Sequence, residues 1–124
     1  MTRPKLPRRR PHTVIAAVVG GVRVHLGIGY MPDGAGAREI FIDLHREGSP
    51  VRGLYHVIAQ LASIALRAGV PVMTIVRVLR TVEERELDVE EHDAIAVARS
   101  IPDYIGQALA AEFPGATAPP PSSA

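Results

Sequence analysis

The chain has 124 residues, of which 47% are hydrophobic and 22% are charged, and its formal net charge is only +1. This length supports a single domain with its own apolar core. The small net charge indicates no class of partner, and the absence of cysteine excludes disulfides and every cysteine-ligated metal site. No apolar run approaches the roughly 18 residues that a membrane span requires, and no apolar segment typical of a secretion signal follows the basic N-terminus. We therefore expect a cytoplasmic protein that makes no contact with membranes.

The two ends of the chain differ in composition from its middle. Residues 1–12 contain three prolines and five cationic side chains: Arg3, Lys5, Arg8, Arg9 and Arg10. A segment with so little to bury predicts a disordered basic arm. Residues 114–124 predict a disordered tail rich in proline, serine and alanine. The folded domain is therefore expected over residues 13–113.

The first part of this domain has the patterns of β-strands. Residues 13–19 are apolar and β-branched, and Gly20-Gly21 predicts a two-residue turn. Residues 22–30 alternate strictly, with Val22, Val24, Leu26, Ile28 and Tyr30 on one face. After a turn, residues 38–45 predict a third strand. Three successive strands with short connections favour a three-stranded antiparallel meander.

Helical periodicity follows the third strand. The first predicted helix begins at Ser49-Pro50 and ends before Gly69, with apolar side chains at helical spacing: Leu54, Val57, Ile58, Leu61, Ile64 and Ala65. A second helix is expected from Pro71, and a polar stretch follows at residues 83–93.

The last helical segment begins with Ser100-Ile-Pro-Asp103, which has the spacing of a capping box, and extends to about Glu112. Together these elements predict an α+β fold in two layers, in which the meander packs against three to four helices.

The start of the first predicted helix is a candidate anion site. Gly48 and Ser49 would present free N–H groups at the positive end of the helix dipole, and Arg52 would add a charged partner for a nucleotide phosphate. Alternatively, Ser49 only caps the helix and Arg52 is solvated.

The basic arm provides a second set of candidate phosphate contacts: Arg8, Arg9 and Arg10. Their binding to nucleic acid would weaken with salt. No aromatic side chain accompanies them to stack on bases, which favours a solvated linker.

Two further pairs of residues have structural explanations. Gly27 and Gly29 remove side chains from one face of the second strand, which close helix packing or a bulge explains, with helix packing favoured. His25 and His45 could face each other across neighbouring strands. Because the five histidines show no H-x-x-x-H or H-E-x-x-H spacing, we predict no metal site.

The candidate acid–base groups are also better explained by structure. Glu39 and Asp43 share a strand face about 13 Å apart, which is too far for a conventional carboxylate pair. Asp103 fits a helix cap. No catalytic residue is predicted.

Three stretches of the chain resemble one known domain. They are residues 19–50, with Glu39-Ile-Phe-Ile-Asp43; the helix ending at Ser63, Leu66 and Gly69-Val-Pro71; and residues 92–110, with Ser-Ile-Pro-Asp-Tyr-Ile. In this order they resemble the TSCPD domain that follows the catalytic barrel in adenosylcobalamin-dependent (class II) ribonucleotide reductases. Residues 6–11 also resemble the linker that enters the domain, so the resemblance covers about residues 6–113.

The chain departs from that family in its sulfur content and in one acidic stretch. Ser100-Ile101-Pro102-Asp103 takes the place of the motif that names the domain, without its cysteine, and residues 83–91 are acidic where the family has aromatic, proline and glycine residues. The family's barrel, radical cysteine and reducing dithiol have no counterpart here.

The resemblance implies a stand-alone module related to vitamin B12-dependent ribonucleoside-diphosphate reductase and to deoxyribonucleotide synthesis. Ribonucleotide reduction requires a thiyl radical and two reducing thiols, so independent catalysis is not expected from a chain without cysteine. Adenosylcobalamin is implied only by family association, and we expect this chain to bind no cofactor. The module is expected to be accessory or non-catalytic and to bind a reductase chain or a nucleotide.

Two alternatives remain open at this stage. The first is a small nucleic-acid-associated protein that uses its basic N-terminal arm. The second is a homo-oligomeric structural module in which two copies pair through an exposed edge strand at residues 38–45.

Overall fold

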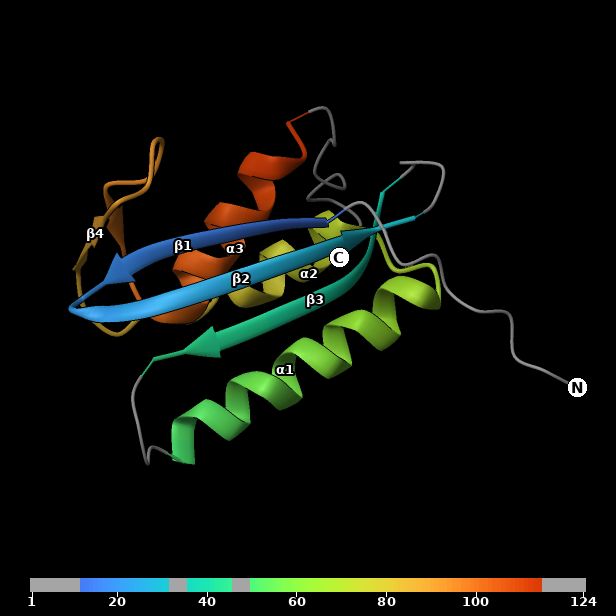
Figure 1. The fold of residues 1–124 in the computed structure, drawn as a ribbon, viewed down its shortest axis with the longest axis horizontal. Helices are drawn as coiled ribbons and strands as arrows, with labels where there is room; N and C mark the ends of the chain where they lie inside the picture. The colour runs from blue at the N-terminus through green and yellow to red at the C-terminus, as the bar shows by residue number, and fades with distance from the viewer. Residues whose placement is uncertain (1–11, 32–35, 46–49, 115–124) are drawn as a thin grey trace, which may run out of the picture.

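The computed structural model describes residues 12–31, 36–45 and 50–114. The predicted arm, except for His12, and the predicted tail, except for Pro114, lie outside these residues. The elements follow in the order β1 (His12–Val19), β2 (Val22–Tyr30), β3 (Ala37–Leu44), α1 (Pro50–Arg67), α2 (Val72–Leu79), β4 (Leu87–Glu90), β5 (Val97–Ala98) and α3 (Ile101–Glu112). The predicted α+β class is confirmed (Figure 1).

The strands form one antiparallel sheet in the order β3-β2-β1-β4-β5. The β1–β2–β3 meander is present, and Gly20 and Gly21 make its first turn with φ values of 56° and 82°. The prediction of only three strands is wrong, because β4 and β5 extend the sheet beyond β1. With four and two residues, these strands are too short for alternation to distinguish them from a polar loop.

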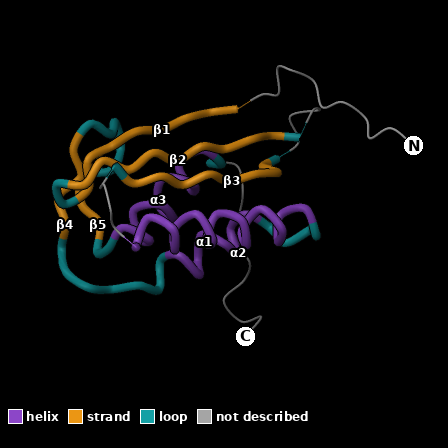
Figure 2. The backbone as a smooth tube through the Cα atoms, turned by 60° about the horizontal axis from the view of Figure 1, so that its bottom comes forward, coloured by secondary structure: helices purple, strands orange, loops and turns teal. Residues whose placement is uncertain are grey.

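One face of the sheet carries the core. The predicted apolar face of β2 is confirmed, since Val24, Leu26 and Ile28 have no exposed surface. Helix α3 supplies Tyr104, Ile105, Ala108 and Leu109, all fully buried, and α2 packs mainly on α3. Figure 2 shows the helices on one side of the sheet, which leaves the other face of the meander uncovered.

Helix α1 lies along β3 at the edge of the sheet (Figure 1). The Ser63 hydroxyl accepts a hydrogen bond from the Ile40 N–H (2.9 Å) and lies 3.2 Å from the Ile40 carbonyl oxygen. A side chain of α1 therefore satisfies edge groups of β3 that a neighbouring strand would otherwise use. The expectation that residues 38–45 form an exposed edge for pairing copies is not met at this position.

The predicted cap of the last helix is confirmed. Ser100 is the N-cap of α3, and its hydroxyl oxygen accepts a hydrogen bond from the Asp103 N–H (3.0 Å). The same hydroxyl donates to the Val82 carbonyl (2.7 Å), so the cap also fixes the connection between α2 and β4.

None of the helices in the described part of the chain is long and apolar enough to cross a membrane.

Candidate functional surface

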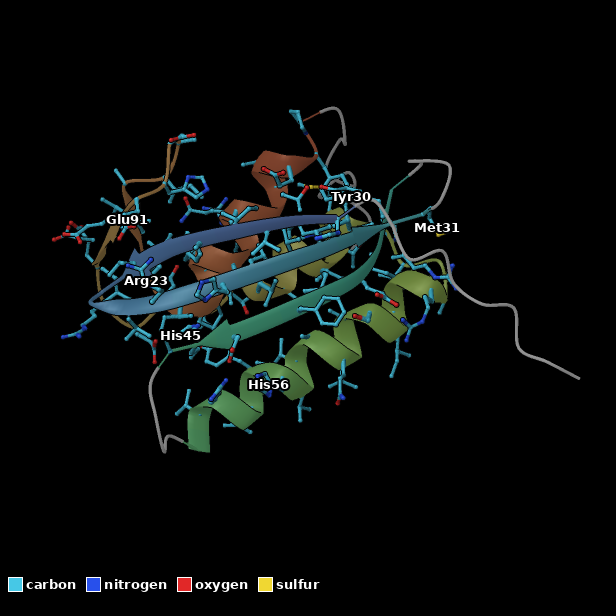
Figure 3. All side chains as sticks on the ribbon, in the orientation of Figure 1. Arg23, Tyr30, Met31, His45, His56 and Glu91 are labelled. Carbon is cyan, nitrogen blue, oxygen red and sulfur yellow. The ribbon has the colours of Figure 1, made fainter. Side chains whose placement is uncertain are left out.

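A groove of about 980 Å³ lies between the uncovered face of the meander and α1. The most exposed apolar side chains that line it are Val14 of β1 and Phe41 of β3, each 61% exposed, and Ile64 of α1, 57% exposed. Polar groups from both sides also line it: His12, His25, Glu39, Asp43, His56, Gln60 and Arg67. In Figure 3, His56 lies on the side of α1 next to β3.

Gly27 and Gly29 make room for side chains of the neighbouring strand. Gly27 pairs with Phe41 and Gly29 with Glu39, and a Cβ at Gly27 would lie 3.3 Å from that of Phe41. The prediction of close helix packing is wrong, because the side chains that approach these two glycines belong to the neighbouring strand β3. A register shift follows Gly29, so the predicted bulge is present.

The groove carboxylates are paired with cations of α1. Asp43 receives two hydrogen bonds from Arg52, at 2.7 and 3.0 Å, and lies 3.2 Å from His56 Nε2. The hydrogen bond from Arg52 lowers the pKa of Asp43 to about 2, partly opposed by desolvation. Glu39 lies 3.8 Å from Arg67. These partners bind β3 to α1, and an Asp43 that remains ionised is a poor proton carrier.

The predicted anion site is only partly described. Gly48 and Ser49 lie outside the described residues, as do Arg8, Arg9 and Arg10. Arg52 is present, but its guanidinium is engaged by Asp43 in a bidentate pair. A phosphate at this position would have to compete with that carboxylate.

The predicted histidine pair is confirmed. The rings of His25 and His45 meet edge to face with their centroids 4.5 Å apart. His25 Nδ1 is buried and has no hydrogen-bond partner among the described residues. Among all the residues that the structure describes, no group of three or more histidine and carboxylate side chains could hold a metal ion.

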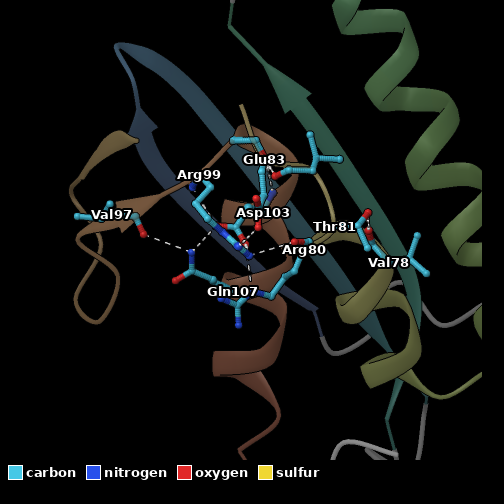
Figure 4. A network of polar contacts seen from close by, with 10 residues as sticks. Val78, Arg80, Thr81, Glu83, Val97, Arg99, Asp103 and Gln107 are labelled. Atoms are coloured by element: carbon cyan, nitrogen blue, oxygen red, sulfur yellow. Dashed lines mark hydrogen bonds and ion pairs between the residues drawn. The ribbon is translucent and has the colours of Figure 1, made fainter. Parts of the chain in front are cut away.

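A second polar cluster surrounds Asp103, whose exposed fraction is only 1% (Figure 4). Its carboxylate accepts hydrogen bonds from Arg80 Nε (3.0 Å), the Arg99 N–H (2.9 Å) and Gln107 Nε2 (3.0 Å). Burial raises the pKa of Asp103, but hydrogen bonds from Arg99, Arg80 and Gln107 outweigh it, and the net pKa is lowered.

The Asp103 cluster is structural, because it connects α2, the end of β5 and the first turns of α3. The S-x-x-D spacing predicted the cap, but it carried no information on Arg80, which is 23 residues away in the chain.

The largest exposed apolar feature of α1 was missed in the sequence. Leu54, Val57, Leu61 and Ile64 are 48–63% exposed; we call these four residues the α1 stripe. Their helical spacing was predicted, but spacing alone does not show which of these side chains are exposed. The residues of α1 that are buried are instead Tyr55, Ala59 and Ser63. The apolar side chains of α1 thus cover a wider arc of the helix than β3 buries. The width of this arc in the sequence was the signal that part of it would remain exposed.

Comparison with known proteins identifies the family of this fold. A model of the TSCPD domain matches residues 2–113. The chain is 40% identical over 114 residues to the vitamin B12-dependent ribonucleotide reductase of Agrobacterium fabrum. The matched region covers 91% of this chain and 9% of that protein. It is 38% identical over 112 residues to the enzyme of the same name from Bradyrhizobium diazoefficiens, with coverage of 90% and 9%.

The similarity extends to shorter relatives at lower identity. The vitamin B12-dependent ribonucleotide reductase of Streptantibioticus cattleyicolor is 29% identical over 111 residues, which are 90% of this chain and 18% of that protein. No solved structure matches. By these coverages, the chain spans about a tenth to a fifth of the length of the reductases that it matches. Over nearly all of its own length, it belongs to the TSCPD domain family.

Proposed function

We propose that this chain is an accessory, non-catalytic module of vitamin B12-dependent deoxyribonucleotide synthesis that acts by binding a reductase chain. The α1 stripe is the observation that carries the proposal. Four apolar side chains on one helix, each about half exposed or more, form the kind of surface that marks a protein interface. Scattered single exposed apolar residues would carry no such meaning.

The chemistry of the chain supports binding rather than turnover. A reductase needs cysteine thiols, which the sequence lacks, and the TSCPD motif here caps a helix and neutralises two arginines. The named relatives depend on vitamin B12, and this chain lacks the thiols on which ribonucleotide reduction depends.

Nucleotide binding at Gly48, Ser49 and Arg52 is the less favoured form of the proposal. The pair between Arg52 and Asp43 already uses the guanidinium that would contact a phosphate. Binding of nucleic acid through residues 1–11 is less favoured still, because it would leave the α1 stripe without a role.

The test uses the purified chain and the purified B12-dependent reductase of the same organism. Size-exclusion chromatography with light scattering should show a complex that survives high salt and deletion of residues 1–11, because apolar contacts are not screened. The chain alone should form no deoxyribonucleotide when supplied with adenosylcobalamin, dithiol and ribonucleotide. Failure to form the complex would refute the docking role, and turnover by the chain alone would refute its non-catalytic character.

A further inference from the structure

The α1 stripe has the spacing of a helix-pairing seam. Its residues follow one another at intervals of three, four and three positions, from Leu54 to Ile64. This 3–4 alternation places the four side chains in one row along α1, the arrangement that inserts into the surface of a second helix. A flat partner or an extended strand would not require that alternation.

The charge of α1 is entirely of one sign. The helix contains Arg52 and Arg67 but no acidic residue, and the acid-free segment extends from Gly48 to Val82. Arg67 follows Ile64 by three positions and therefore flanks the stripe. Its 3.8 Å contact with Glu39 is longer than a hydrogen bond, and its side chain is 42% exposed. Acidic groups on the partner would complement this flank.

A second copy of this chain fits the stripe poorly. If two α1 helices faced each other, neither would offer Arg67 of the other an acidic side chain, because α1 contains none. A partner helix with carboxylates at its flanks would instead place the opposite charge beside Arg67.

We infer that the α1 stripe is one half of a two-helix seam, whose other half is an amphipathic helix with an apolar 3–4 repeat and acidic flanks. This inference rests on the proposed function, in which that helix belongs to a reductase chain. It adds the chemistry of the partner element and the residues that select it: Leu61 at the centre of the seam and Arg67 at its flank.

The test uses two synthetic helical peptides as probes. Both carry leucine in a 3–4 repeat; one has glutamate at the flanking positions and the other has lysine. Because the chain has no cysteine, the substitution Ala68→Cys beside the stripe places one fluorophore at a unique site. We expect the glutamate peptide to bind about two- to fivefold more tightly than the lysine peptide, and Leu61→Glu to remove binding of both.

Val97→Glu is the matched control, since Val97 is 42% exposed on β5 and outside the stripe; it should change neither affinity. Thermal unfolding verifies that both variants fold, which is expected for exposed positions. Equal binding of the two peptides, insensitivity to Leu61→Glu, or no saturable binding would overturn the inference.

The same variants, mixed with the purified reductase, separate this inference from the proposed function. A reductase complex that tolerates Leu61→Glu would preserve the docking role and refute the seam. Binding of the glutamate peptide without binding of the reductase would preserve the seam and refute the reductase as partner.

Discussion

At the scale of single residues, Asp103 is the polar group on which the C-terminal half depends. It is buried and accepts hydrogen bonds from Arg80, Arg99 and Gln107. Asp103→Asn keeps the shape of the side chain but removes its charge, and we expect a loss of about 1–3 kcal/mol in the free energy of unfolding at neutral pH. Urea denaturation measures it, with Asp88→Asn on the exposed surface of β4 as a control without effect.

The contribution of Asp103 to stability should depend on pH. Since its pKa is lowered in the folded state from a usual value of 3.8, the stabilisation is present above that value and is lost as pH falls through the folded pKa. The difference between wild type and Asp103→Asn should therefore shrink in acid. A difference that is constant from neutral pH to pH 2 would contradict this electrostatic account.

Tyr104 is the opposite case, because its hydroxyl is buried without the hydrogen bonds that Asp103 receives. Its hydroxyl has no hydrogen-bond partner among the described residues, and burial raises its pKa to about 12. Tyr104→Phe should leave stability unchanged or slightly higher, because no hydrogen bond is lost. Tyr30→Phe is the matched comparison: its hydroxyl lies 3.2 Å from Thr13 Oγ1, and its removal should cost about 0.5–1.5 kcal/mol. A loss for Tyr104→Phe equal to that for Tyr30→Phe would show that the Tyr104 hydroxyl has a partner.

At the scale of elements, the contact between α2 and α3 requires a glycine. A Cβ at Gly106 would lie 2.7 Å from Arg80 Cγ and 3.1 Å from the Val76 carbonyl oxygen. Gly106→Ala should therefore destabilise the fold by about 1–3 kcal/mol through overpacking, although alanine is the better helix former by about 1 kcal/mol.

Gly53 in α1 is the control for that prediction. A Cβ there meets nothing within 4 Å, so Gly53→Ala should stabilise the protein by a few tenths to about 1 kcal/mol. Thermal unfolding of the two variants distinguishes the contact from propensity, since propensity alone would make both changes stabilising.

The elements also show which features of the fold can be predicted from sequence patterns. The alternation in β2 and the cap at Ser100 depend on residues close in the chain, and both were predicted. The partners of Asp103 and the exposure of the α1 stripe depend on which segments become neighbours, and periodicity carries no such information. Of the predicted anion site, the described residues contain only Arg52, which is bound to a carboxylate of β3 that spacing could not assign to it.

At the scale of the whole molecule, the chain is a TSCPD domain whose core lies on one face of the sheet and whose α1 presents apolar side chains outward. The outward apolar side chains of α1 are the surface that the proposed partner would cover. The relatives contain the same domain within much longer chains, which explains why a reductase chain is the first partner to test.

Hydrogen–deuterium exchange of the purified chain with and without the purified reductase tests the docking role most directly. The account predicts slower amide exchange in peptides that cover residues 54–67 when the reductase is present, and unchanged exchange around the Asp103 cluster in residues 97–110. Unchanged exchange over residues 54–67, at concentrations where a complex has formed, would contradict it.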